Sequence, residues 1–186
     1  KKIILVTLRP IINHMEGLRI ELFDRYDETL QKIIQISKNN PQIEIIFKLH
    51  PQQNISNNII KNMISKNEKI KFFQHEPIKE LLENCDLHVN IATDNFDASS
   101  VILESMLLKK PTLNIQLQNN TFEFEFIKDD AIKTINYDVD ISKEILNLFD
   151  KKLSSQLIKN SQKHLIRYMK NRNIASSTLI NSITKF

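Results

Sequence analysis

Short apolar runs rich in Ile, Val, Leu and Phe alternate along the chain with longer stretches in which apolar residues recur every three or four positions. The first pattern predicts buried strands and the second predicts amphipathic helices. The predicted strands cover residues 3–8, 43–49, 70–73, 86–92 and 111–116. The predicted helices cover residues 21–38, 56–65, 99–110 and the final stretch, and one more opens with Pro77, a residue favoured in a first helical turn.

Strands separated by single helices, each apolar enough to be buried on both faces, are typical of a parallel sheet. Because such crossovers are right-handed, we predict an α/β fold with a Rossmann-like, doubly wound parallel sheet. Residues 1–186 would form a single domain in which 142–186 are closing helices. The chain starts at Lys1 and enters a strand at once, so we expect a domain cut from a longer, two-domain protein.

The composition narrows the function classes. Hydrophobic residues make up 41% and charged residues 26%, as in ordinary globular proteins, and the formal net charge of +4 suits an anionic ligand but is too small to indicate nucleic-acid binding. Cys85 is the only cysteine, which excludes an internal disulfide and favours a reducing compartment. No apolar run approaches the roughly 20 residues of a membrane span, so we expect a cytoplasmic protein. The single glycine, Gly17, excludes the two common glycine-rich phosphate-binding motifs.

The second predicted strand ends with "KLHP", residues 48–51. Ligands of open α/β sheets bind at the carboxyl ends of the strands. Pro51 favours an extended conformation for His50, whose imidazole would then project from the sheet edge and could donate to a phosphate oxygen. A histidine that only caps a turn is the alternative.

The segment "TDNFDASSVILE", residues 93–104, follows another strand and enters a helix. Ser99 and Ser100 open this helix, where free N–H groups and the positive end of the helix dipole can bind an anion. The simpler interpretation is an N-cap. Glu104 lies one turn further on the same face as Ser100, where it could accept hydrogen bonds from a ribose diol or face solvent.

These segments together resemble the carboxyl-terminal nucleotide-binding half of GT-B-fold glycosyltransferases. The resemblance rests on "IEIIFKLHP" and "IKFFQHEPIKELLENCDLHVNIATDNFDASSVILESMLLKKPTLNI". The shared features are the His-Pro pair, an aspartate that opens a strand, the Ser-Ser helix start, a helix glutamate, and a strand opened by Lys110 and Pro111. Similar patterns occur in capsule and teichoic-acid polysaccharide transferases, in bacterial sialyltransferases and polysialyltransferases, and in UDP-N-acetylglucosamine 2-epimerases.

The resemblance implies specific site residues. The implied phosphate-binding residues are Arg9, Lys48, His50, Ser99 and Ser100. His50 is also the implied catalytic residue, and Glu104 matches the acid that binds the ribose. Arg9 stands where the epimerases carry a basic segment. The loop at residues 74–77 would contact the base through backbone groups, so the identity of its side chains says little about the base.

The implied ligand is a nucleotide-sugar donor linked to UDP, CMP or CDP, and the implied acceptor is a glycan or a lipid-linked molecule of surface-polysaccharide biosynthesis. Such enzymes need no metal or cofactor, because a helix dipole, hydroxyls and a basic side chain stabilise the leaving nucleotide. A separate amino-terminal domain would supply the base that activates the acceptor. Two alternatives stay open: a nucleotide-sugar 2-epimerase, and a non-catalytic α/β module that binds a partner protein through its sheet edge.

Other charged residues predict less specific features. The five histidines have no metal-ligand spacing. A solvated loop is favoured over a cation site at Asp94 and Asp97, and Asp129 and Asp130 are predicted to form an exposed turn. A basic tail could rest on anionic lipid at the inner face of the membrane, although a solvated helix face is favoured. The tail comprises Lys151, Lys152, Lys159, Lys163, Arg167, Lys170 and Arg172.

Overall fold

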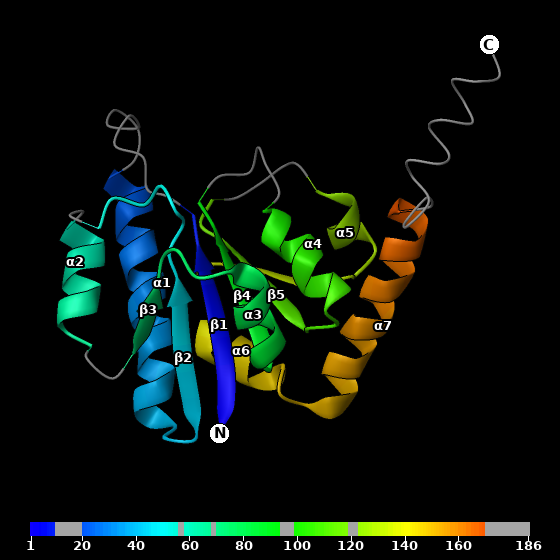
Figure 1. Cartoon of the computed structure of the whole chain (residues 1–186), viewed down its shortest axis with the longest axis horizontal. Coiled ribbons are helices and arrows are strands. Elements are labelled where there is room, and N and C mark those ends of the chain that lie inside the picture. Colours follow the sequence, from blue (N-terminus) through cyan, green and yellow to red (C-terminus); the bar gives the residue numbers. More distant parts are fainter. Residues whose placement is uncertain (10–19, 56–57, 68–69, 94–98, 119–122, 170–186) are drawn as a thin grey trace, which may run out of the picture.

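The computed structural model describes residues 1–9, 20–55, 58–67, 70–93, 99–118 and 123–169 (Figure 1). They form a six-stranded sheet in which every pair of neighbouring strands is parallel, in the order β3-β2-β1-β4-β5-β6. The strands are β1 (Lys2–Leu8), β2 (Ile43–Lys48), β3 (Lys71–Phe73), β4 (Leu87–Ala92), β5 (Thr112–Gln116) and β6 (Lys133–Asn136). The helices are α1 (Ile20–Asn39), α2 (Asn58–Ser65), α3 (Ile78–Asn84), α4 (Ser100–Leu107), α5 (Glu125–Lys128), α6 (Ile141–Asn147) and α7 (Lys151–Tyr168).

The strand order confirms the predicted doubly wound sheet. From the central strand β1 the chain first builds outward to β3, then returns and builds the other half from β4 to β6. The direction of winding therefore reverses between β1 and β4, which is where open α/β sheets form a crevice at their carboxyl edge. Helices α3 and α4 lie together on one side of the sheet, and α7 stands beside α4 (Figure 1).

The face covered by α1 and α6 holds the main hydrophobic core. Tyr26 and Leu30 of α1 and Ile145 of α6 are buried against Val6 of β1 and Val89 of β4. These side chains come from the alternating positions of each strand that point to this face. Here the prediction of apolar, buried strands is confirmed.

The opposite face, under α3 and α4, is apolar only in part. Leu82 of α3 packs against Leu5 and Ile46. Further along the sheet the buried positions of β4 and β5 are polar, as His88 and Asn114 show. The prediction that these strands are buried on both faces is thus confirmed for β4 and β5, although one of the two faces is polar, because short runs such as "LHVNIA" alternate between apolar and polar residues.

Polar side chains of β1, β4 and β5 form a continuous hydrogen-bonded chain on this face of the sheet. This buried polar chain comprises His88, Thr7, Asn90 and Asn114. The Thr7 hydroxyl donates to Asn90 Oδ1 at 3.2 Å, and Asn90 Nδ2 donates to Asn114 Oδ1 at 2.7 Å. His88 Nε2 lies 2.9 Å from the Thr7 oxygen, and it must donate because the hydroxyl proton is already used. His88 Nδ1 is then the unprotonated nitrogen, and it has no partner among the described residues. Burial lowers the pKa of His88 to about 3, so the ring is neutral at physiological pH.

Two helices end in a left-handed turn without glycine. After α4, Lys109 has φ 55°, its N–H donates to Met106 O at 3.0 Å, and the N–H of Lys110 donates to Ser105 O at 2.9 Å. This pair of bonds is the Schellman motif, whose left-handed position usually holds glycine. Helix α5 ends in the same way at Asp130, with φ 50°. Each side chain at such a position costs of the order of 1 kcal/mol relative to glycine.

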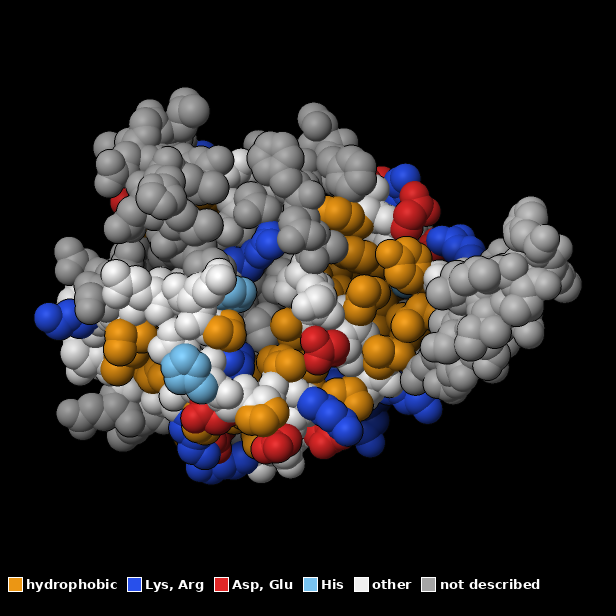
Figure 2. Space-filling model, turned by 45° about the horizontal axis from the view of Figure 1, so that its top comes forward, with side chains coloured by type: hydrophobic (Ala, Val, Ile, Leu, Met, Phe, Trp, Pro, Cys, Tyr) orange, Lys and Arg blue, Asp and Glu red, His pale blue; other side chains and the backbone are white. Residues whose placement is uncertain are grey.

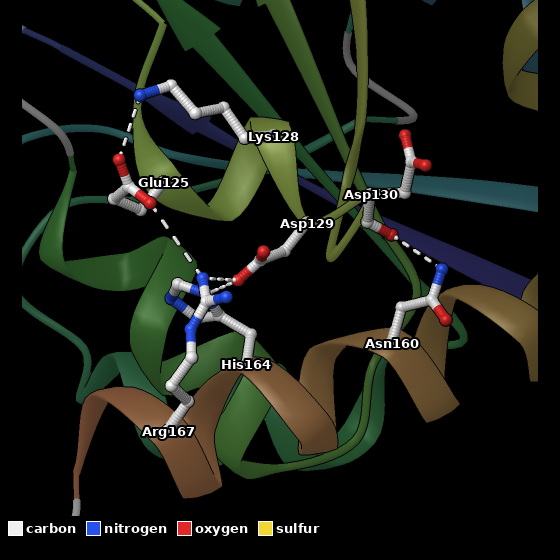
Figure 3. Close-up of polar contacts among 7 residues, drawn as sticks. All are labelled: Glu125, Lys128, Asp129, Asp130, Asn160, His164 and Arg167. Atoms are coloured by element: carbon white, nitrogen blue, oxygen red, sulfur yellow. Dashed lines mark hydrogen bonds and ion pairs between the residues drawn. The ribbon is translucent and has the colours of Figure 1, made fainter.

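The segment after β5 contains two elements that the hydrophobic pattern did not predict, α5 and β6. Asp129 lies in the turn between them, as expected, but its side chain is only 21% exposed (Figure 3). Its carboxylate accepts a hydrogen bond from Nδ1 of the buried His164 at 2.6 Å and pairs with Arg167 of α7. The hydrogen bond from His164, together with Arg167, lowers the pKa of Asp129. The prediction of a merely exposed turn is wrong for Asp129, because it holds α7 against α5.

The predicted starts of α3 and of the closing helices differ slightly from those in the structure. Pro77 is the residue before α3 and not part of its first turn. The described part of the predicted closing helices, 142–186, forms α6 and α7, and residues 170–186 lie outside the described ranges. The first turns of α6 and α7 are capped by Asp140 and Asp150 through side-chain bonds of 3.0 and 2.9 Å. The basic residues of α7 from 151 to 167 are exposed, as both a solvated face and a lipid contact require. Within the described ranges, none of the helices combines the length and the apolarity needed to cross a membrane.

The buried, neutral His88 predicts a pH dependence of stability. Since its pKa is near 3 in the fold and about 6.5 when exposed, the unfolded chain gains a proton below pH 6.5 that the folded chain does not. The free energy of unfolding should therefore fall as the pH drops from 6.5 towards 3, with His88 contributing up to about 1.4 kcal/mol per pH unit. Urea unfolding at pH 6.5, 5.5 and 4.5 measures this slope.

The His88→Leu variant should show a shallower slope than the wild type over that pH range. His75→Leu, at an exposed position, is the matched control and should keep the wild-type slope. Equal slopes in all three proteins would mean that His88 does not carry this proton linkage.

Candidate functional site

A cavity of about 560 Å³ opens at the carboxyl edge of the sheet, between the ends of β1 and β2 and the start of α4. Its volume lies in the usual range for small-molecule sites. All six residues singled out in the sequence line it: Arg9, Lys48, His50, Ser99, Ser100 and Glu104. On this side of the molecule, basic and histidine side chains gather near the middle of the surface (Figure 2).

His50 follows β2 and is half-buried. The backbone N–H of Gln52 donates to its Nδ1 at 3.2 Å, which leaves the proton of the neutral ring on Nε2. Burial lowers the pKa of His50, and the nearby charges of Arg9 and Lys48 lower it further. The two sequence interpretations are thus compatible, because one ring nitrogen accepts from the turn while the residue lines the cavity.

Lys48 is the last residue of β2 and is only 8% exposed. Its ammonium donates to the carbonyl of Gln74 and, at 3.2 Å, to the carbonyl of Leu49. Burial lowers the pKa of Lys48, and the neighbouring Glu76 partly offsets this. One of the three ammonium donors therefore joins β2 to the loop after β3 and a second binds the chain just after β2, while the charge stays at the cavity wall.

The side chain of Gln74 holds the His-Pro turn in place. Its Nε2 lies 3.3 Å from the carbonyl oxygen of His50, 3.2 Å from that of Pro51 and 2.8 Å from that of Gln53. The side chain of Gln74 therefore has a structural role in the loop at residues 74–77, while the backbone contact of this loop with a nucleotide base stays a prediction. The Gln74 amide fills the space between two loops that follow neighbouring strands, a contact that local sequence patterns do not reveal.

Helix α4 begins at the cavity. Ser99 occupies the N-cap position in an extended conformation, but its side chain makes no capping hydrogen bond. Ser100 is exposed, and Glu104 lies half-buried one turn further along the cavity wall. The simple N-cap interpretation thus does not describe the Ser99 side chain, while the position of both serines on the cavity is what an anion site at the helix start requires.

Several lining residues were not found from the sequence. Thr7 of β1 and Asn90 of β4 belong to the buried polar chain and also line the cavity. His75 and Glu76, which follow β3, line the cavity as well. The sequence feature that could have indicated Thr7 and Asn90 is a polar residue near the carboxyl end of an otherwise apolar strand. Among the described residues, the ionic side chains at the cavity are Arg9, Lys48, Glu76 and Glu104. The two positive side chains follow β1 and end β2, and the two carboxylates partly balance their charge.

Other residues of the sequence pattern have structural roles away from the cavity. Asp86 accepts a hydrogen bond from the backbone N–H of Ile3 at 2.8 Å, which joins the amino ends of β4 and β1. The ammonium of Lys110 donates to the carbonyls of Glu83 and Cys85 at 2.9 and 2.8 Å, near the end of α3. The Asp94 and Asp97 positions lie outside the described residues. The described ranges contain no group of three or more His, Cys, Asp or Glu residues that could hold a metal ion.

No protein-family model matches the sequence, and no curated protein matches it significantly. Solved structures do match. Anabaena HepE in complex with UDP and glucose has a TM-score of 0.61 at 13% identity, and the match covers 100% of this chain and 49% of HepE. WaaG, a glycosyltransferase involved in lipopolysaccharide biosynthesis, has a TM-score of 0.56 at 15% identity, over 94% of this chain and 45% of WaaG.

A protein from Listeria monocytogenes described as a UDP-N-acetylglucosamine 2-epimerase has a TM-score of 0.57 at 17% identity, over 91% of this chain and 45% of that protein. The chain thus spans a little under half the length of these three structures. At such low identity the similarity concerns the fold. This fold is one that glycosyltransferases and nucleotide-sugar enzymes share.

The Gln74 contacts predict that this side chain stabilises the His50 loop. Gln74→Ala should lose up to three hydrogen bonds and lower the free energy of unfolding by about 1–3 kcal/mol. Amide hydrogen exchange of a peptide covering residues 49–54 should become faster. Gln52→Ala, which changes an exposed side chain in the same turn, is the control and should leave that exchange rate unchanged. Unchanged exchange in Gln74→Ala would contradict the role assigned to Gln74.

Proposed function

We propose that this chain is the nucleotide-sugar binding domain of a metal-independent glycosyltransferase in surface-polysaccharide or glycan biosynthesis. The observation that carries the proposal is the convergence of the six sequence-derived residues on one cavity at the point where the sheet reverses direction. They come from three separate segments of the chain, after β1, at the end of β2 and in α4. Arg9, Lys48 and His50 supply positive or hydrogen-bond donating groups, and Glu104 supplies an acceptor.

In this proposal the donor phosphates lie between the basic side chains and the start of α4. The negative charge that develops when the nucleotide leaves would be stabilised by groups that are already in position, which is electrostatic preorganisation. Neutral His50 can donate its Nε2–H to a phosphate oxygen without first gaining a proton, because Nδ1 is the nitrogen that accepts from Gln52. Glu104 would accept hydrogen bonds from the ribose hydroxyls.

The donor nucleotide is proposed to be UDP, with CMP and CDP as alternatives, because HepE, which has the same fold, was solved with UDP and glucose. The acceptor would be a glycan or a lipid-linked molecule. Its activating base would come from an amino-terminal domain across the cleft, in keeping with a chain that spans 49% of HepE and 45% of WaaG. By itself this domain should bind the donor nucleotide and turn over little substrate.

A nucleotide-sugar 2-epimerase is the second candidate. It is favoured by the position of Arg9 on the cavity wall, where a basic group after the first strand would bind phosphate, and by the fold shared with the Listeria protein. A full-length protein that interconverts UDP-N-acetylglucosamine and its 2-epimer without an acceptor would decide for it. A non-catalytic interaction module would bind none of the nucleotides.

The phosphate role of the α4 start predicts the effect of removing its hydroxyls. The double variant Ser99→Ala and Ser100→Ala should weaken UDP binding by about 1–3 kcal/mol, since hydrogen bonds to a charged group are lost. Isothermal titration calorimetry measures the change, and circular dichroism checks the fold. The double variant Ser154→Ala and Ser155→Ala, near the start of α7, is the matched control and should keep the wild-type affinity for UDP. Unchanged affinity in the folded α4 variant would reject the phosphate role.

His50 predicts a pH dependence of binding. A bound phosphate favours the imidazolium and raises the pKa of His50 in the complex, whereas in the free protein the pKa is held below its usual 6.5. The affinity for UDP should therefore rise as the pH falls through the pKa of the complex, and level off below the pKa of the free protein. His50→Ala should remove this rise, and uridine, which lacks phosphate, should not show it. Parallel pH profiles for the wild type and His50→Ala would reject His50 as a phosphate ligand.

A further inference from the structure

The cavity has two chemically different parts. Arg9, Glu76 and Glu104 line it from segments outside the strands, whereas Lys48, Thr7 and Asn90 line it from the sheet. Strand pairing places Lys48, Thr7, Asn90 and Asn114 side by side, because Thr7 is in register with Lys48 and Asn90, and Asn90 with Asn114. These four side chains form one row on the same face of the sheet, near its carboxyl edge. The row changes from a charged residue on β2 to neutral polar residues on β1, β4 and β5.

Asn90 is positioned by its neighbours and still has capacity to bind. An asparagine amide has two N–H donors and an oxygen with two lone pairs. One lone pair accepts from Thr7 at 3.2 Å, and one N–H donates to Asn114 at 2.7 Å. The bond from Thr7, whose hydroxyl is in turn held by His88, fixes which end of the amide points which way. One N–H and one lone pair of Asn90 have no further partner among the described residues.

We propose that Asn90, oriented by Thr7 and Asn114, binds a sugar hydroxyl, so that the charged and the neutral side chains of the cavity hold different parts of one ligand. This inference rests on the proposed function, in which the ligand is a nucleotide sugar. A hydroxyl both donates and accepts, which matches the remaining N–H and lone pair of the amide. A phosphate only accepts, so it would place negative oxygens near the Asn90 carbonyl and is better matched by the charged side chains.

A pair of hydroxyl side chains on the same face of the sheet makes a polar contact that is purely structural. Ser105 of α4 and Thr112 of β5 lie 2.7 Å apart, both are fully buried, and neither lines the cavity. Thr112 is one row further from the carboxyl edge, in register with His88. The Ser105–Thr112 pair joins helix to sheet, whereas the row with Asn90 reaches the cavity. Thr112→Val is therefore the matched control for a buried polar group outside the site.

Two hydroxyl-bearing groups of the ligand have the required chemistry, the ribose and the transferred sugar. Calorimetric titration of the chain with pyrophosphate, UDP and UDP-glucose separates them. Pyrophosphate carries no hydroxyl, UDP adds the ribose, and UDP-glucose adds the second sugar. The proteins to compare are the wild type, Asn90→Ala, Thr7→Val and Thr112→Val, each checked for its fold by circular dichroism and thermal unfolding.

Asn90→Ala should weaken UDP-glucose binding about tenfold and leave pyrophosphate binding within about twofold of the wild type. If UDP is weakened as much as UDP-glucose, the hydroxyl belongs to the ribose; if UDP is unaffected, it belongs to the transferred sugar. Thr7→Val should weaken the same ligands by about threefold, since the amide stays but is less well oriented, and it carries the test if Asn90→Ala does not fold. Thr112→Val should change none of the three affinities.

Two results would overturn the assignment of Asn90 alone. One is wild-type affinity of Asn90→Ala for UDP and UDP-glucose, and the other is an equal loss for pyrophosphate, which would indicate a general distortion of the cavity. A wild-type protein that binds none of the three ligands would instead overturn the proposed function, and the role of Asn90 with it.

Discussion

The reversal of strand order between β1 and β4 is the constraint on which the site depends. Right-handed crossovers place the helices of the two halves on opposite faces of the sheet. The segments that follow the carboxyl ends of β1 and β4 therefore diverge. The cavity lies at this divergence, and its lining comes from the ends of β1, β2 and β4 and from the start of α4. Residues as distant in sequence as Arg9 and Glu104 meet there because the topology brings their strands together.

The groups of the site are held by ordinary backbone interactions. Lys48 donates to carbonyl groups at the end of β2 and after β3, and Gln74 donates to three carbonyls of the His50 turn. The Lys48 ammonium and the His50 turn thus keep their positions through hydrogen bonds that belong to the fold. Groups held in this way need little rearrangement when they bind a ligand, which reduces the entropic cost of binding.

The fold class was predictable because short apolar runs and helical periodicity both reflect burial, and five of the six strands lie in such runs. Strand β6 ("KTIN") and the one-turn helix α5 are too short to show a period, so they were missed. The candidate residues His50, Ser99 and Glu104 were found because each stands beside a strand end or helix start. Thr7, Asn90 and Gln74 were not, because their contacts join strands and loops that only the folded sheet places together.

The two Schellman turns at Lys109 and Asp130 show that a helix end in this protein can take a left-handed conformation without glycine. The backbone bonds of each turn are intact although a side chain occupies the position that glycine normally takes. Sequence comparison relies strongly on glycines of this kind, because at a left-handed position few other residues are tolerated. A search for helix ends that looks for glycine would therefore miss both of these turns, although their backbone hydrogen bonds are complete.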